Sequence, residues 1–459
     1  MKKNSLILFL SLTLSLVGCS TSSDNSKSTA KKKDASQKET TLKVNSSYID
    51  LEEGTPKEYT FKFTYTNSLF TNKATKFNKD LALLSYGLAV SNQDKETIAT
   101  FYSDLGFSNV EYASEYDDAP KVDEVGYTFA TKEVNNFNLV AVSVRGFNYG
   151  AQWIDNFDLG EEGDHVGLIQ KSTDVHNYLN QYVSKIDNDK PVKLWMAGYS
   201  RGGAIVNGLA SKILSSPLTT INKDDIYVYT FEAPRILVEE HAVKYDNVFN
   251  IINSADLVTK LAPEEYGLYR CGIDVEIYSK DFDKNIKAYD KDAVIPEFKA
   301  SLLYKDDAGL ADYVMKCLLT DNEPEEGERN WSASTRELYN ANYGEDISYL
   351  VNLIALSDDV SIEDITSLME NISTQELLAL VGGSSAAMIS YVEDMLDELE
   401  VSYDPEQLEK AFNDLYNFFQ QPSITLLLGA FTSVDTLVRL VDMHMPDTTY
   451  MLLNALKIL

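Results

Sequence analysis

The sequence predicts an α/β fold with a mostly parallel central sheet, and three observations support this prediction. Residues 192–197 form an apolar run that leads directly into a glycine-flanked serine, and small and apolar residues then recur at helical spacing over 204–213. Two further runs, 227–231 and 247–252, have the length and composition of buried strands. Asp256 follows the second of these runs, at the strand end where active sites of open parallel sheets lie.

The pentapeptide Gly-Tyr-Ser-Arg-Gly at 198–202 has the pattern of the nucleophile elbow of an α/β-hydrolase. Such an elbow is a sharp turn between a strand and a helix that lifts the serine hydroxyl out of the sheet. Gly198 and Gly202 fit this role, because a larger side chain there would clash as the strand packs against the helix. A glycine-rich structural turn is the alternative. The strand and helix on either side favour Ser200 as a catalytic nucleophile.

The acid of a serine hydrolase of this type should follow one of the strands after the elbow helix. Asp256 occupies such a position, whereas Asp246 precedes its strand and therefore lies at the wrong end of it. Asp256 could instead only cap the helix that follows. We predict that it holds the catalytic histidine in the correct tautomer.

The catalytic histidine follows from chain order. In α/β-hydrolases the nucleophile, the acid and the histidine occur in that order, and two of the four histidines precede Ser200. His241 precedes Asp256 and, among charged neighbours, is predicted to be a solvated helical position. His444 is therefore the predicted general base, in a loop that leads into a last helix.

The N-terminus has the pattern of a secretion signal. Two lysines precede a mostly apolar stretch that is too short to span a bilayer, and the sequence Leu-Val-Gly-Cys at 16–19 resembles a bacterial lipobox. This resemblance implies a signal peptide over 1–18 and a lipid on Cys19, which would anchor the protein to the extracytoplasmic side of the membrane in a bacterial cell envelope. An ordinary signal peptide is the alternative. Residues 19–41 are polar and are predicted to be a disordered tether.

Composition excludes some classes of partner. The formal net charge of −31 argues against binding to nucleic acid and against electrostatic attraction to anionic lipid. The acidic runs at 281–283 and 323–328 lack the spacing of a calcium loop, so neither a metal nor a cofactor is expected. Cys271 and Cys317 lie in apolar contexts and are expected to be buried free thiols, although they could pair.

The chain divides into a hydrolase domain with a long insertion. Residues 42–284 form its predicted main part, and residues 436–459 its C-terminal part. A strand is expected over 49–65 and a helix over 78–91. Residues 285–435 have helix signals, including Asp404-Pro405 at one helix start, and are predicted to form a helical cap. The cap has either an ordinary core or an apolar face that acts as a lid.

Four further stretches resemble those of the class 3 lipase family, the fungal triacylglycerol-lipase type of α/β-hydrolase. They are Val-Arg-Gly at 144–146, Gln-Trp-Ile-Asp at 152–155, His-Val-Gly-Leu at 165–168 and Thr-Phe-Glu-Ala-Pro-Arg at 230–235. The resemblance implies an oxyanion hole made by the main-chain N–H groups of Phe147 and Arg201, with His165 in a packing and hydrogen-bonding role. Trp153 is a candidate for the wall of the substrate cleft, with a place in the core as the alternative. Glu232 stands where the family has glycine, so the resemblance does not define the backbone conformation there.

The predicted function is hydrolysis of carboxylic esters at the cell surface through an acyl-enzyme, with acylglycerols or other lipid esters as substrates. An acyltransferase or an esterase for non-lipid substrates could use the same three residues. A catalytically silent surface-binding lipoprotein is the alternative outside the enzymes. Ser200, Asp256 and His444 in the correct order disfavour it, because a binding module does not need all three.

Overall fold

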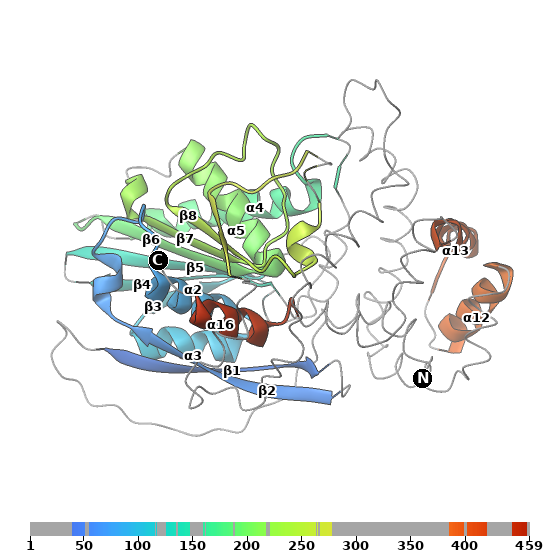
Figure 1. Cartoon of the computed structure of the whole chain (residues 1–459), viewed down its shortest axis with the longest axis horizontal. Helices are drawn as coiled ribbons and strands as arrows, with labels where there is room; N and C mark the ends of the chain where they lie inside the picture. Colours follow the sequence, from blue (N-terminus) through green and yellow to red (C-terminus); the bar gives the residue numbers. More distant parts are fainter. Residues whose placement is uncertain are drawn as a thin grey trace.

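The computed structural model describes residues 39–50, 55–114, 116, 125–134, 136–146, 159–160, 162–186, 189–216, 221–262, 264, 267–277, 385–398, 402–419 and 443–456. Their main feature is a seven-stranded sheet in which the strands lie side by side in sequence order (Figure 1). The strands are β3 (Ser108–Tyr112), β4 (Tyr127–Val134), β5 (Phe137–Val144), β6 (Val192–Tyr199), β7 (Ile226–Phe231), β8 (Val248–Ile252) and β9 (Ile273–Glu276). The pairs from β5 to β9 are parallel, and β3 and β4 add an antiparallel edge. The predicted α/β-hydrolase fold is confirmed.

Helices cover both faces of the sheet. On one face lie α4 (Val166–Ser184) and α5 (Ser200–Ser215), and on the other α2 (Lys79–Ser91) and α16 (Pro446–Ala455) (Figure 1). Alternation along β6 explains the two layers: Leu194 and Met196 pack with the α4 and α5 side, and Trp195 packs with the opposite core. Because both faces are covered, the central strands are wholly buried and their sequences are mostly apolar.

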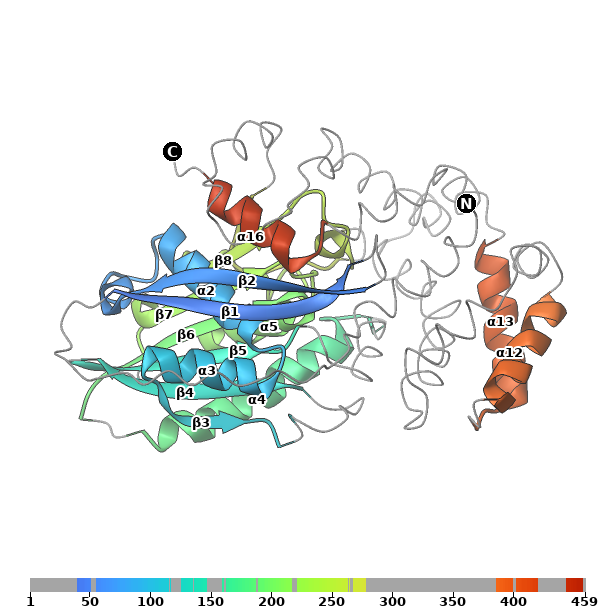
Figure 2. The ribbon, with the colours of Figure 1, turned by 90° about the horizontal axis from the view of Figure 1, so that it is seen from below.

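A β-hairpin precedes the hydrolase sheet. Strands β1 (Thr40–Asp50) and β2 (Thr55–Tyr65) pair antiparallel and pass over α2 and α3 (Lys95–Leu105) (Figure 2). The predicted strand over 49–65 corresponds mainly to β2, whereas the structure has a second strand, β1, that the sequence did not predict. β1 also begins inside the predicted tether of residues 19–41, because alternate residues such as Leu42 are buried in the core of the domain. The 3-10 helix η1 (Asn67–Phe70) follows, and η3 (Lys223–Asp225) precedes β7.

Two helices of the predicted insertion are described, α12 (Ser385–Glu398) and α13 (Pro405–Phe419). They pack on each other and are drawn away from the sheet in both views (Figures 1 and 2). The Asp404 carboxylate caps α13 by accepting from the N–H of Glu406 at 3.0 Å, at the predicted start. Most of residues 285–435 lie outside the described part of the chain, so the cap and its boundaries stay predictions. None of the helices in the described ranges is long and apolar enough to cross a membrane.

Candidate active site

Ser200 lies at the sharp turn between β6 and α5. Its φ of +53° is unusual for a residue with a side chain and indicates a strained backbone. A Cβ atom on Gly198 would lie 2.3 Å from the carbonyl oxygen of Gly202, which is the clash that the sequence predicts between strand and helix. A Cβ on Gly202 would instead lie 2.2 Å from the carbonyl oxygen of Val144, at the end of β5. Both glycines therefore let backbone segments approach closely around the serine.

Three side chains from distant parts of the chain meet at this turn. Nε2 of His444 lies 2.8 Å from Ser200 Oγ, and Nδ1 lies 2.7 Å from Asp256 Oδ2. Ser200 follows β6, Asp256 follows β8, and His444 precedes α16. All three are buried, with exposed fractions of 5 %, 0 % and 3 %. The structure thus brings together the three residues that chain order singles out, in the hydrogen-bonded sequence serine, histidine, aspartate.

Asp256 uses its two carboxylate oxygens for different partners. Oδ2 faces the imidazole, and Oδ1 accepts from the N–H of Val258 at 2.8 Å, at the start of the 3-10 helix η4 (Val258–Lys260). The Thr259 hydroxyl also donates to the Asp256 carbonyl oxygen at 2.8 Å. One carboxylate oxygen of Asp256 therefore holds the main chain at Val258, while the other contacts the imidazole of His444.

The main chain around His444 is held by side chains that the sequence analysis did not identify. Asn253 Nδ2 donates to the Met443 carbonyl at 3.0 Å, and the Tyr86 hydroxyl donates to the Pro446 carbonyl at 2.6 Å. The Tyr199 hydroxyl donates to the carbonyl of His444 itself. These donors come from three different elements, and no sequence pattern links them to residue 444. Together they fix the position of the imidazole.

Glu232 lies close to this triad and is wholly buried. It directly follows β7, and its φ of +48° lies in the left-handed region that glycine, the family's residue at this position, adopts without strain. Its Oε2 accepts from the N–H of Asn253 at 2.8 Å, and its Oε1 accepts from the Thr449 hydroxyl at 3.0 Å. Burial, followed by the charge of Asp256, raises the pKa of Glu232 well above its usual value.

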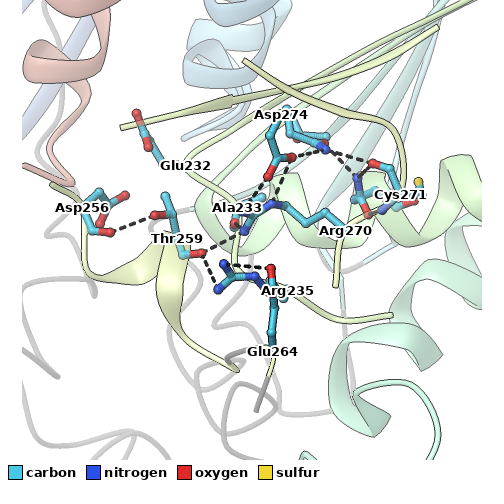
Figure 3. A network of polar contacts seen from close by, with 12 residues as sticks. Glu232, Ala233, Arg235, Asp256, Thr259, Glu264, Arg270, Cys271 and Asp274 are labelled. Atoms are coloured by element: carbon cyan, nitrogen blue, oxygen red, sulfur yellow. Dashed lines mark hydrogen bonds and ion pairs between the residues drawn. The ribbon is translucent and has the colours of Figure 1, made fainter. Parts of the chain in front are cut away.

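A guanidinium joins the loop after β7 to the loop that carries Asp256 (Figure 3). Arg270 Nη1 donates to the carbonyls of Ala233 at 2.9 Å and Thr259 at 2.8 Å, and Nη2 pairs with Asp274 at 3.1 Å. Arg235 reaches the same Thr259 carbonyl at 3.4 Å, so its contact is weaker. The acid loop is therefore fastened from outside the triad as well.

The other histidines lie elsewhere. His241 is 53 % exposed and its Nδ1 lies 2.8 Å from Asp164 Oδ2. It is solvated as predicted, but it lies in a turn and not in a helix. His165 is buried at the start of α4, and its main-chain N–H donates to the carbonyl of Ile236 at 2.9 Å.

Several predicted site residues cannot be placed. Phe147, Trp153 and Cys19 lie outside the described residues. Arg201, the other predicted oxyanion-hole residue, is buried in the first turn of α5, where helical N–H groups have no acceptor within the helix.

Cys271 is a buried free thiol whose pKa is raised by burial. Its Sγ lies 3.3 Å from the carbonyl oxygen of Asn207, in the polar network at the right of Figure 3. Cys317, which could pair with it, lies outside the described residues. Within the part of the chain that is described, no group of three His, Cys, Asp or Glu residues is arranged to hold a metal ion.

Comparison with known proteins agrees with this geometry. Residues 96–266 match the family model for lipase (class 3), a range that includes Ser200 and Asp256 and ends before His444. No curated protein sequence matches the chain. Similar solved structures include the Rhizomucor miehei lipase–propeptide complex (16 % identity, 44 % of this chain and 68 % of that chain, TM-score 0.33) and lipase II from Rhizopus niveus (15 % identity, 43 % and 80 %, TM-score 0.32). Lipase from Rhizopus microsporus var. chinensis is 13 % identical over 47 % of this chain and 76 % of that chain, with a TM-score of 0.32.

The family match supports the class 3 lipase family. Its range contains the elbow serine and the aspartate, and the structure adds the histidine that completes a serine hydrolase arrangement. The protein is therefore a serine carboxylic-ester hydrolase.

Proposed function

We propose that this protein hydrolyses lipid esters, such as acylglycerols, through an acyl-enzyme on Ser200, while a lipid on Cys19 holds it at the outer face of a membrane. The observation that carries the proposal is the pair of contacts at His444, 2.8 Å to Ser200 Oγ and 2.7 Å to Asp256 Oδ2. Contacts of this length allow a proton to move from the serine to the imidazole while the aspartate holds the ring.

In the first half of the reaction, Ser200 Oγ attacks the carbonyl carbon of the ester. His444 takes the hydroxyl proton on Nε2, and Asp256 stabilises the imidazolium that forms. His444 then gives this proton to the departing alcohol, which leaves an acyl group on Ser200. The burial of all three side chains strengthens these interactions, because little water screens them.

The negative charge on the substrate oxygen needs hydrogen-bond donors. We assign this role to the main-chain N–H groups of Arg201 and Phe147. The position of Arg201 in the first turn of α5 supports its part, since N–H groups and the helix dipole favour an anion there. The part of Phe147 rests on the resemblance of the Val-Arg-Gly-Phe stretch.

In the second half, water attacks the acyl-enzyme. His444 now removes a proton from the water, and the carboxylic acid leaves as Ser200 recovers its proton. An acyltransferase would differ only here, because an alcohol acceptor would replace the water. Free fatty acid as the product therefore distinguishes hydrolysis from transfer.

The proposed anchor rests on the N-terminal sequence. Residues 20–39 could span at most about 70 Å when fully extended, at roughly 3.5 Å per residue. A tether of this length would hold the catalytic domain near the membrane surface without fixing its orientation. Trp153 is a candidate for the wall that contacts the acyl chain, on the strength of the family resemblance.

A fluorophosphonate probe tests the proposal, because it reacts with activated serines of serine hydrolases. We expect stoichiometric labelling, with the adduct on the peptide that contains Ser200, and release of free fatty acid from acylglycerol micelles. His444→Ala should not be labelled, whereas the exposed His241→Ala should label as the wild type does. Failure of the folded wild-type protein to react would contradict the proposal and favour a silent binding protein.

A further inference from the structure

Glu232 connects the two loops that carry the acid and the base. Through Oε2 it accepts from Asn253, three residues before Asp256, and through Oε1 from Thr449, five residues after His444. Asn253 in turn donates to the carbonyl of Met443. A single buried side chain therefore spans from the acid loop to the first turns of α16.

The backbone at Glu232 is strained, which is typical of residues at functional sites. Its φ of +48° lies in the left-handed region, which glycine adopts without strain and glutamate does not. Strained residues persist where their surroundings hold them, and they cluster at functional sites.

The surroundings of Glu232 favour its protonated form. The side chain is wholly buried, and burial, followed by the charge of Asp256, raises its pKa well above the usual value. Its two oxygens nevertheless have donors, the N–H of Asn253 and the Thr449 hydroxyl. Glu232 is therefore a buried carboxyl group whose hydrogen bonds reach two different loops.

We propose that Glu232 is a positioning residue for the triad, whose buried carboxyl group ties the loop of Asp256 to the helix after His444 through Asn253 and Thr449. This inference rests on the proposed hydrolysis at Ser200. Glu232 makes no contact with Ser200 or His444 among the hydrogen bonds described above, and it acts through the geometry of the two loops.

The charges near Glu232 also disfavour its ionisation. The charge of Asp256 raises the pKa of Glu232. On the facing helix α2, the pKa of Tyr86 is raised by burial and by a set of acidic groups that includes Glu232, Asp447 and Tyr450 of α16. Acidic groups in such a set oppose one another's ionisation.

Infrared spectroscopy tests the protonation directly and does not depend on turnover. At neutral pH the carbonyl stretch of a protonated carboxylic acid should be present in the wild type and absent in Glu232→Gln. Glu239→Gln, at an exposed position on the following loop, should keep the band. A band that persists in Glu232→Gln, or is missing from the wild type, would show that Glu232 is not protonated in the folded protein.

Kinetics on a soluble short-chain ester test the positioning role. Glu232→Gln keeps a neutral group of similar shape that can accept from Asn253 and donate to Thr449, so its kcat should stay within about threefold of that of the wild type. Glu232→Gly removes both hydrogen bonds while it suits the positive φ, and kcat should fall about ten- to hundredfold with KM changed less than about threefold. Thr449→Val should lower kcat in the same direction, and Thr449→Ser should restore it, which gives a test even if Glu232→Gly folds poorly.

These experiments distinguish failure of the proposed hydrolysis from failure of the role proposed for Glu232. A wild type that hydrolyses no ester would contradict the proposed function. An active wild type whose Glu232→Gly variant folds and keeps its kcat would overturn only the role of Glu232. A Glu232→Gln variant as impaired as Glu232→Gly would also overturn it, because the neutral group would then not suffice.

Discussion

The hydroxyl of Tyr199 donates a hydrogen bond to the main-chain carbonyl of His444. Tyr199 is the residue immediately before the nucleophile, and its ring centroid lies 5.4 Å from that of the imidazole. The end of β6 therefore places the serine and also holds the loop of the base, although 244 residues separate Ser200 from His444. This contact links the nucleophile strand directly to the main chain of the catalytic base.

Removal of this hydroxyl should impair catalysis more than folding. In Tyr199→Phe the buried carbonyl of His444 loses a donor, so the imidazole should move relative to Ser200. We expect kcat to fall about tenfold, which corresponds to roughly 1.4 kcal/mol, with KM little changed. Steady-state kinetics check this, with Tyr178→Phe on α4 as an exposed control. Equal kcat values for both variants would show that Tyr199 has no part in placing the base.

The two arginines near the acid loop should differ strongly when each is changed to methionine. Arg270 is 4 % exposed and donates to two buried carbonyls, so Arg270→Met should lower the free energy of unfolding by about 3 kcal/mol. Arg235 makes longer contacts, one with the exposed Glu264 at 3.7 Å, and Arg235→Met should cost less than about 1 kcal/mol. Urea denaturation measures both. Similar losses would mean that Arg270 does not fasten this loop.

The raised pKa of Glu232 predicts a pH-dependent stability. The folded protein keeps a proton that the unfolded chain releases above pH 4.5, so the contribution of Glu232 is complete below that pH and is lost as pH rises towards the folded-state pKa. Glu232→Gln does not titrate. As pH rises from about 5 to 7, the free energy of unfolding of Glu232→Gln should therefore increase relative to that of the wild type, by up to about 1.4 kcal/mol per pH unit. Denaturation at several pH values checks this, and a difference that stays constant with pH would argue that Glu232 is ionised.

The proposed lipid anchor predicts that loss of Cys19 releases the protein from the membrane but leaves its esterase activity intact. Cys19→Ser should abolish incorporation of a labelled fatty acid and move the protein out of the membrane fraction. The turnover of soluble short-chain esters should stay within about twofold, because the tether has no composition that could pack on the core. Fractionation with an activity assay measures both. Fatty-acid labelling of Cys19→Ser would contradict lipidation at this residue.

Much of the fold follows from local sequence signals. The strand, turn and helix around Ser200 follow from apolar runs and two glycines, since a buried parallel strand and a close backbone approach leave few alternatives. The helix predicted over 78–91 is α2, and the predicted last helix after His444 is α16. The strand predicted over 49–65 does not include most of β1, because the residues of β1 are mainly polar and few of them alternate with apolar residues.

The supporting contacts of the site could not be predicted in the same way. Chain order selects Asp256 and His444 because the fold imposes that order. The roles of Tyr86, Asn253 and Tyr199 depend on which carbonyl each side chain reaches, and those carbonyls lie up to 360 residues away. The one available signal was Glu232 in place of glycine, which marks an unusual backbone but does not identify its partners.

The most direct test of the central claim is the kcat/KM of Ser200→Ala on a soluble ester, measured on protein shown by circular dichroism to be folded. The account predicts a loss of at least about a thousandfold, because only the oxyanion hole and substrate binding would remain. An activity within about tenfold of the wild type would contradict the account, since the nucleophile would then lie elsewhere.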